Sequence, residues 1–331
     1  MRALSLGEVG MLRLLKLLQD GRFHSGEALG LALGISRSAI WKQLQCLEAE
    51  LALPIHKVRG RGYRLESPLL LLDEGVLAES PVCRHWPVSI MQSVDSTNSE
   101  AMRRLDARQA PPFIVLAESQ TAGRGRRGRS WVSPFAENLY YSLVLRVDGG
   151  MRQLEGLSLV VGLALLRALQ GVGVSAVGLK WPNDLLVQGR KIAGILLEVS
   201  GDPADVCHVV IGIGVNVNML VDSREAIDQP WTSVRAELGR LVDRNELVCG
   251  LNLQLSRYLD LHQAQGFSAL LGEWQENHLW QGRTVALTSG AQSVEGVVLG
   301  IDSSGAIRLR VAGVERCFSG GELSLRLRDD S

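Results

Sequence analysis

The chain has 331 residues, of which 46% are hydrophobic and 21% are charged, with 35 Lys and Arg against 35 Asp and Glu. This length predicts two or three domains, and this composition excludes a mini-protein, a disordered chain and a fibrous chain. Apolar stretches fall short of the roughly 18 residues that span a membrane, and Glu8 interrupts any secretory signal. We therefore expect a cytoplasmic protein without a membrane partner.

The balanced charge hides an asymmetry between the front of the chain and the rest. Residues 1–65 carry ten Lys and Arg against five Asp and Glu, whereas the remainder carries 25 against 30. A basic module on a slightly acidic body is typical of a protein whose front binds nucleic acid. On charge alone, a basic front without that role is an equal alternative. The five cysteines lack a C-x-x-C pair, which argues against disulfides and a thiolate zinc site.

Three helical patterns follow one another in the basic segment. The leucines of 12–18 form an amphipathic stripe, Ser25 can cap a second helix over 26–33, and Ser36 can cap a third that runs to about residue 50. Glycine turns separate the helices, which is the spacing of a helix-turn-helix.

A short hairpin follows these helices. Apolar runs at 55–58 and 63–65 flank Arg59-Gly60-Arg61-Gly62, whose glycines permit a tight tip and whose arginines we expect to face outward. The segment therefore predicts a winged helix-turn-helix that binds DNA, although small three-helix modules also bind proteins. The candidate DNA contacts are Arg37, Ser38, Trp41, Lys42, Arg59 and Arg61.

From about residue 85 the chain alternates strand-like and helix-like segments, which predicts a mixed α+β sheet domain. The expected strands are 113–117, 139–147, 177–180, 185–187, 191–198 and 206–217, and the expected helices are 154–169 and 245–265. After residue 284, short apolar segments between glycine turns predict a small antiparallel β-barrel. The predicted domains are 1–66, 67–275 and 276–331, and the fold class is α+β.

The run Gly123-Arg124-Gly125-Arg126-Arg127-Gly128-Arg129-Ser130-Trp131 places four arginines within six residues. Guanidinium groups this crowded repel one another unless an anion accepts their hydrogen bonds, so we expect a phosphate- or carboxylate-binding loop that is mobile without its anion. The run also satisfies G-x-G-x-x-G, but 130–134 cannot open the regular helix that a dinucleotide site needs. A dinucleotide site and a solvated basic loop remain less favoured alternatives.

A second constellation begins at Lys180-Trp181-Pro182-Asn183-Asp184. Pro182 should end a strand and display Asn183 and Asp184, which could hold magnesium-bound water or a ribose hydroxyl, although an ordinary turn is as plausible. Lys191 opens the next apolar strand, where its ammonium group could meet an anionic reacting group. The uncharged patches at 95–98 and 211–218 suit a neutral polar ligand.

Taken in order, these motifs resemble the bifunctional biotin protein ligases, also called biotin operon repressors. The motifs that carry the resemblance are DSTN at 95–98, GRGRRGRSW at 123–131, KWPND at 180–184, RKIAGIL at 190–196 and GIGVN at 212–216. HSGEALG at 24–30, GISRSAIWK at 34–42 and VRGRGYRL at 58–65 resemble the regulatory version of the family. The resemblance implies a central ligase domain and an SH3-like carboxy-terminal barrel.

The resemblance also implies roles for individual residues. The biotin-binding residues would be Ser96, Thr97, Asn98, Gln120, Arg124, Gly125, Arg126, Lys191 and Gly194. Those that bind ATP or the adenylate would be Arg126, Arg129, Trp131, Lys180, Asn183, Asp184, Asn216 and Trp231. Lys191, Arg126 and Arg124 would be catalytic, Asp184 would serve Mg²⁺ through the phosphates, and Glu322 and Arg326 would complete the nucleotide side.

The implied reaction joins biotin to ATP as biotinyl-AMP and passes biotin to a lysine of the biotin carboxyl carrier protein of acetyl-CoA carboxylase. None of the motifs contains His or Cys, so charge stabilisation and positioning should carry the rate. Biotinyl-AMP would order the loops at 123–131 and 219–231, drive homodimerisation through a sheet edge near 139–147 and promote operator DNA binding. A ligand sensor without catalysis is the alternative from a different class, and lipoate attachment is disfavoured.

Overall fold

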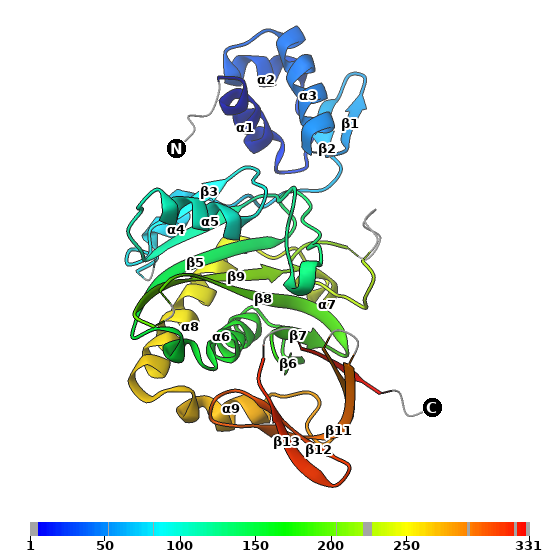
Figure 1. Cartoon of the computed structure of the whole chain (residues 1–331). Coiled ribbons are helices and arrows are strands. Elements are labelled where there is room, and N and C mark those ends of the chain that lie inside the picture. Colours follow the sequence, from blue (N-terminus) through cyan, green and yellow to red (C-terminus); the bar gives the residue numbers. More distant parts are fainter. Residues whose placement is uncertain are drawn as a thin grey trace. The chain divides into compact units, whose positions relative to one another are not determined.

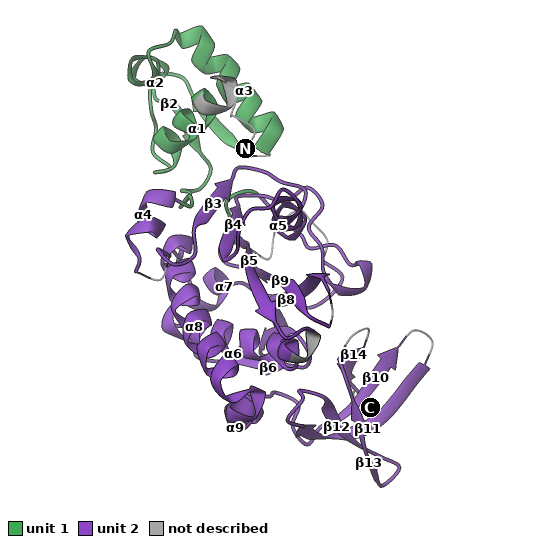
Figure 2. Cartoon of the chain, turned by 60° about the vertical axis from the view of Figure 1, so that its left-hand side comes forward, with its two compact units in different colours: residues 1–72, 135–137 green, residues 73–134, 138–331 purple. Residues whose placement is uncertain are grey.

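The computed structural model describes residues 6–51, 53–81, 83–202, 204–220, 227–289, 292–320 and 323–328. These residues belong to two compact units, one made of 1–72 with 135–137 and the other of 73–134 with 138–331 (Figure 2). Among the described residues, no helix is both long and apolar enough to cross a membrane. The division into three domains at 1–66, 67–275 and 276–331 stays a prediction.

The first unit has the predicted winged helix-turn-helix (Figure 1). Its elements are α1 (Leu6–Leu18), α2 (Gly26–Leu33), α3 (Arg37–Leu51), β1 (Ile55–Val58) and β2 (Gly62–Leu65). Ser25 caps α2 by accepting a hydrogen bond from the Ala28 N–H at 3.0 Å, and Gly34 ends the helix in the left-handed conformation. The buried side of α3 joins a core that also contains Phe135 and Ala136.

The central sheet carries the candidate site. Its described strands run in the order β3 (Val88–Met91), β4 (Phe113–Ala117), β5 (Leu139–Asp148), β9 (Val206–Val215), β8 (Arg190–Gly201), β7 (Asp184–Val187) and β6 (Val177–Lys180). Neighbouring strands are antiparallel except β3 and β4. Ser142 of β5 contacts α5 (Thr97–Asp106), whereas Tyr141 contacts α8 (Arg244–Gln265). Since side chains alternate along a strand, α5 and α8 cover opposite faces of the sheet.

The hydropathy pattern of the sequence did not predict β3 or α5. β3 has only four residues, all half-buried, and α5 is mostly polar, with its first residues interpreted as a ligand patch. The predicted dimer edge near 139–147 is wrong for most of that strand, because β5 lies between β4 and β9. Pairing with β4 covers 140–144 of β5, and 145–148 extend past it. The helix expected at 154–169 is α6 (Leu157–Gly171), which packs against α8 (Figure 1).

The carboxy-terminal strands form an antiparallel sheet, as predicted. Its described strands run in the order β13 (Val314–Phe318), β12 (Ile307–Val311), β11 (Gln292–Ile301), β10 (Thr284–Ser289) and β14 (Ser324–Leu327). Two contacts connect this sheet to the functional motifs: Trp181 Nε1 donates to the Gly305 carbonyl at 3.0 Å, and Arg126 Nη2 donates to the Leu323 carbonyl at 2.9 Å. The carboxy-terminal sheet therefore helps to hold residues 123–131, the arginine loop.

A buried ion pair joins three elements beside the site. Arg244, at the start of α8, has no exposed surface and lies with its Nη2 2.5 Å from Glu118 Oε2, just after β4. Its Nη1 also donates to the Asn138 carbonyl at 3.0 Å, just before β5. The pair therefore fixes where β4 ends, and Gln120 of the pocket lies two residues further on.

We predict that Arg244→Ala lowers the free energy of unfolding by about 3–5 kcal/mol, because it removes the cation bonded to a buried carboxylate. Urea unfolding at neutral pH measures the change. Arg308→Ala is the matched control: it breaks the more exposed Arg308–Glu315 pair, 2.7 Å apart, and should lower the free energy of unfolding far less. Equal effects of the two substitutions would contradict the prediction.

Candidate active site

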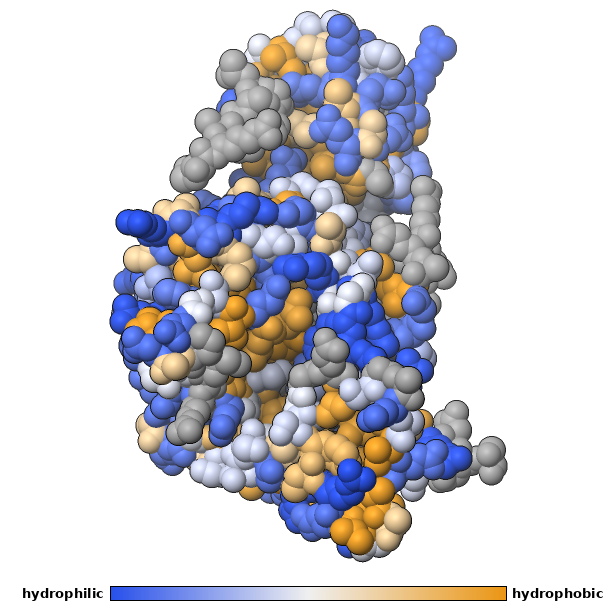
Figure 3. Space-filling view, in the orientation of Figure 1, coloured by the Kyte–Doolittle hydropathy of each residue, from blue (hydrophilic) through white to orange (hydrophobic). Residues whose placement is uncertain are grey.

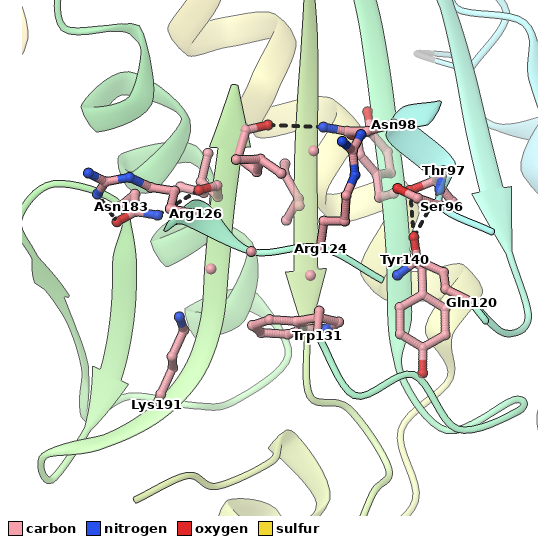
Figure 4. A pocket seen from close by; sticks show the side chains of 18 residues that line it. Ser96, Thr97, Asn98, Gln120, Arg124, Arg126, Trp131, Tyr140, Asn183 and Lys191 are labelled. Atoms are coloured by element: carbon pink, nitrogen blue, oxygen red, sulfur yellow. Dashed lines mark hydrogen bonds between the residues drawn. The ribbon is translucent and has the colours of Figure 1, made fainter. Parts of the chain in front are cut away.

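One pocket lies over β5, β9 and β8, between the start of α5 and the arginine loop (Figure 4). The space-filling view shows apolar surface in the middle of this face, bordered by hydrophilic side chains (Figure 3). The lining residues are Ser96, Thr97, Asn98, Gln120, Arg124, Gly125, Arg126, Trp131, Tyr140, Tyr141, Asn183, Lys191, Gly194, Ile195, Leu196, Gly212, Ile213 and Gly214. The pocket thus gathers residues from the five motifs at 95–98, 123–131, 180–184, 190–196 and 212–216.

One end of the pocket is polar and uncharged. The Thr97 N–H donates to Gln120 Oε1 at 2.9 Å, and Gln120 Nε2 donates to Ser133 Oγ at 3.1 Å. Ser142 Oγ lies 2.8 Å from Thr97 Oγ1. Ser96 occupies the N-cap position of α5 but makes no capping hydrogen bond with its side chain. The Ser96 hydroxyl can therefore bond a ligand without loss of a helix cap.

The floor of the pocket is an indole ring lying on two glycines. Gly194 of β8 and Gly214 of β9 are paired directly opposite each other on neighbouring strands. A Cβ at Gly214 would lie 2.6 Å from Cε2 of Trp131, and one at Gly194 would lie 3.3 Å from its Cζ3. The Lys191 ammonium lies 5.4 Å from the centre of the same ring. Trp131 Nε1 is buried and has no hydrogen-bond partner among the described residues.

The other end of the pocket is cationic. Arg126 Nη1 donates to Asn183 Oδ1 at 2.8 Å, and Lys191 Nζ lies 2.7 Å from Asp184 Oδ1. Lys180 Nζ lies 3.6 Å from Asp184 Oδ2 and 5.0 Å from the ring centre of Trp280. Burial lowers the pKa of Arg126 and of Lys180, while the Asp184 charge opposes the shift in both.

The predicted biotin residues all line the pocket, but the predicted nucleotide residues do so only in part. Lys180 and Asp184 line a neighbouring recess that also contains Asn183. Asn216 is buried and donates from Nδ2 to the Thr232 carbonyl at 3.0 Å. The remaining nucleotide candidates, Arg129 and Trp231, are not lining residues of the pocket.

Parts of two predictions lie outside the described residues, namely 221–226 of the 219–231 loop and Glu322. Arg326 is exposed and lies on β14, paired with Ala286 of β10. Trp231 forms a β-bridge with Lys191, and Asn98, although it lines the pocket, already donates to Glu198 Oε2 at 2.7 Å. The ligand roles of Arg326, Trp231 and Asn98 stay predictions.

The arginine loop closes on itself and on its neighbours. Arg124 and Ser130 form an antiparallel bridge on either side of the 3₁₀ turn Arg126–Gly128, so no helix opens at Ser130. This arrangement excludes the dinucleotide alternative, which needs a helix there. Arg124 and Arg126 already have protein partners, in addition to any anion that the loop binds.

Sequence reasoning missed Ser142 and Glu198 as site residues, and it placed Gly212 and Gly214 in the polar patch 211–218 without a role of their own. Asn98 lies against Gly212, where a Cβ would come within 2.4 Å of Asn98 Oδ1. The alternating glycines of GIGVN were the available signal, because a strand glycine often marks a close approach by another group. Glu198 had no such signal, since an acidic residue in an apolar strand normally faces solvent.

The candidate DNA contacts lie in the first unit. Arg37, Ser38, Trp41 and Lys42 are exposed on the first turns of α3. Arg59 and Arg61 are exposed at the hairpin tip, and the Arg61 guanidinium lies 4.3 Å from the ring centre of Phe23. This arrangement presents the helix and the wing to solvent.

Residues 90–216 match the Biotin/lipoate A/B protein ligase family, 282–326 the Biotin protein ligase C terminal domain, and 11–64 an HTH domain. The Bifunctional ligase/repressor BirA of Salmonella typhimurium is 40% identical over 315 residues, which is 95% of this chain and 97% of that protein. The protein of the same name from Bacillus subtilis is 30% identical over 306 residues, 90% of this chain and 92% of that one.

Among solved structures, the biotin protein ligase from Aquifex aeolicus in complex with biotin and ATP superposes with a TM-score of 0.63 and 29% identity, covering 73% of this chain and 99% of that one. The fold and the site therefore define a protein ligase joined to a helix-turn-helix module. More narrowly, the chain belongs to the family of bifunctional biotin ligase/repressors.

We predict that Gly214→Ala displaces the Trp131 indole, because the new Cβ would overlap the ring. The overlap should also cost about 1–3 kcal/mol of stability. Fluorine NMR of 5-fluorotryptophan-labelled protein, with the resonance assigned through Trp131→Phe, measures the displacement. Gly250→Ala on α8 is the control, since no atom lies within 4 Å of the Cβ position. An unmoved Trp131 resonance in Gly214→Ala would refute the proposed contact.

Proposed function

We propose that this ligase activates biotin with ATP in the pocket over β5, β9 and β8, and then transfers biotin to a lysine of a biotin carboxyl carrier protein. The observation that carries the proposal is the polarity of the pocket, which has an uncharged hydrogen-bonding end, an apolar and aromatic floor and a cationic end. Biotin has the matching order of groups, namely a ureido ring, an apolar body and a carboxylate. The name of the Aquifex structure, in complex with biotin and ATP, supports the same substrates.

At the uncharged end, Ser96, Thr97 and Gln120 would hold the ureido ring. The Ser96 hydroxyl is not used as a helix cap, and Gln120 is oriented by the Thr97 N–H. The buried Trp131 Nε1 adds a donor that faces no protein acceptor among the described residues. Asn98 donates to Glu198 and so helps to fix this end of the pocket. The backbone at Gly125 and Gly194 would close the pocket around the ligand.

At the cationic end, Arg126 and Lys191 would stabilise the negative charge that develops when the biotin carboxylate attacks the α-phosphate of ATP and pyrophosphate leaves. Both side chains are held before any ligand arrives, Arg126 by Asn183 and the Leu323 carbonyl, and Lys191 by Asp184. Such preorganised charges need little rearrangement during the reaction. We assign Arg124 to the rim of the pocket, where it helps to retain the adenylate.

The ATP phosphates would continue toward Lys180, Asn183, Asp184 and Arg129, and the adenine toward Asn216 and Trp231. Asp184 is a single carboxylate, and the described residues contain no cluster of three His, Cys, Asp or Glu side chains. One carboxylate suits Mg²⁺ that arrives on the phosphates, since this ion normally keeps waters and substrate oxygens as ligands. When bound, Mg²⁺ would neutralise phosphate charge.

No covalent enzyme intermediate is needed in this reaction. The pocket lining contains no His or Cys among the described residues, so the protein binds, orients and neutralises charge. The carrier lysine then attacks the mixed anhydride and AMP leaves.

The direct test is mass spectrometry of a carrier domain incubated with the chain, MgATP and biotin, with one biotinyl addition expected. Lys191→Ala should slow single-turnover adenylation by about 100-fold or more, because one preorganised charge is lost. Arg146→Ala, which breaks the exposed pair with Asp148, is the control. Ligand binding without biotin-dependent exchange of pyrophosphate into ATP would instead favour the non-catalytic sensor.

We further propose that the first unit binds operator DNA in this cytoplasmic protein, as a homodimer formed when biotinyl-AMP is bound. One winged helix makes few base contacts, so a two-fold dimer on a palindrome is needed to select one site. The 145–148 stretch of β5 extends past β4 and offers strand edge for the dimer. Unmodified carrier protein would relieve repression by discharging the adenylate.

A non-hydrolysable biotinyl-AMP analogue should therefore tighten both self-association and operator binding more than biotin does. Sedimentation and DNA titration with no ligand, biotin and the analogue measure the two effects. Arg37→Ala should weaken operator binding and leave the analogue's effect on dimerisation intact. If the analogue moves neither equilibrium, the regulatory proposal fails while the ligase proposal stands.

A further inference from the structure

Glu198 on β8 makes two hydrogen bonds at the uncharged end of the pocket. Its Oε2 accepts from Asn98 Nδ2 at 2.7 Å and from Arg124 Nη2 at 3.0 Å. The Glu198 side chain is 27% exposed and that of Arg124 is 45% exposed. Glu198 therefore stands between a buried amide and an arginine at the rim.

The buried side of this arrangement is rigid. Asn98 is 3% exposed, and its Oδ1 lies 2.6 Å from Ser142 Oγ on β5. Gly212 leaves no room for Asn98 to move toward β9. Asn98 thus holds the Glu198 carboxylate in a fixed position, and Arg124 contacts it from the rim of the pocket.

The two ends of the pocket differ in their charge balance. At the cationic end, Lys180 and Lys191 lie within 4 Å of Asp184, and Arg126 is near enough to feel its charge, so three cations share one carboxylate. At the other end, one cation pairs with one carboxylate among the described residues, namely Arg124 with Glu198. Without the Glu198 charge, both ends of the pocket would be cationic.

We propose that Glu198 is a specificity-determining residue, which cancels the charge of Arg124 and so leaves the pocket with one cationic end. The asymmetry fixes which way round a ligand with one acidic end and a neutral head binds. It also disfavours straight ligands that are acidic at both ends, since specificity requires weak binding of competitors as well as strong binding of the ligand. This inference rests on the proposed biotin site.

The test compares Glu198→Gln with the unaltered chain, because glutamine keeps the size of the side chain and an acceptor for Asn98. Isothermal titration measures the Kd of biotin and of nonanedioate, a straight-chain dicarboxylate. We expect Glu198→Gln to bind nonanedioate about tenfold more tightly and biotin no more weakly. Its single-turnover adenylation should fall because some biotin binds reversed.

Three further measurements separate this role from structural support. The double variant Arg124→Gln/Glu198→Gln should lose the gain in nonanedioate affinity. Arg124→Met should bind nonanedioate more weakly than the unaltered chain, since Glu198 is then uncompensated. Glu315→Gln removes the carboxylate that pairs with Arg308, outside the pocket, and should change nothing.

Unchanged nonanedioate affinity in Glu198→Gln would overturn the proposal, and so would an equal weakening of both ligands. Failure of the unaltered chain to bind biotin would instead count against the proposed function. Failure of this inference is measured on the Glu198→Gln variant, whereas failure of the proposed function is measured on the unaltered chain. The same titration series therefore distinguishes the two failures.

Discussion

The contact between Trp131 and the cross-strand pair Gly194 and Gly214 determines the form of the site. The indole can lie flat on the sheet because neither position has a Cβ. The backbone N–H of Trp131 donates to the Gly123 carbonyl at 2.9 Å, which ties the end of the arginine loop to its beginning. The Lys191 ammonium lies 5.4 Å from the centre of the same ring. One packing contact therefore positions both the loop and the lysine on a rigid sheet, where small displacements would weaken transition-state stabilisation.

The concentration of positive charge at one end has a structural cost that the fold offsets with neutral acceptors. Arg126 is held by an amide oxygen of Asn183 and a backbone carbonyl at Leu323, and burial lowers its pKa. Neutral acceptors orient a guanidinium and leave its charge in place. A carboxylate orients the guanidinium and also cancels its charge. The contrast with Arg124, whose partner is Glu198, shows both arrangements within one loop. The carboxy-terminal sheet contributes to the site through the Leu323 carbonyl.

Local signals predicted the parts of this structure that local physics determines. Ser25 and Gly34 bounded α2 at its observed ends, and the apolar runs located β4 and β6. The partners of Arg126 could not be predicted, because Asn183 and Leu323 are 57 and 197 residues away in sequence. The adenine role of Asn216 stays a prediction, and the hydrogen bond from its amide to the Thr232 carbonyl had no signal in the sequence. A motif shows that a polar group is needed at a site, but only the fold shows what it bonds.

Lys191 connects the pocket to the segment that follows β9. Its N–H donates to the Pro230 carbonyl at 2.9 Å, and its carbonyl accepts from the Thr232 N–H at 2.9 Å. The same residue places its ammonium over Trp131 and against Asp184. An anion that draws the ammonium away from Asp184 would act on a residue whose backbone holds 230–232. Coupling between two sites requires contacts that differ between the free and bound states. Lys191 contacts Trp131 of the arginine loop through its ammonium and residues 230–232 through its backbone, so a ligand that moves the ammonium acts on a residue that touches both.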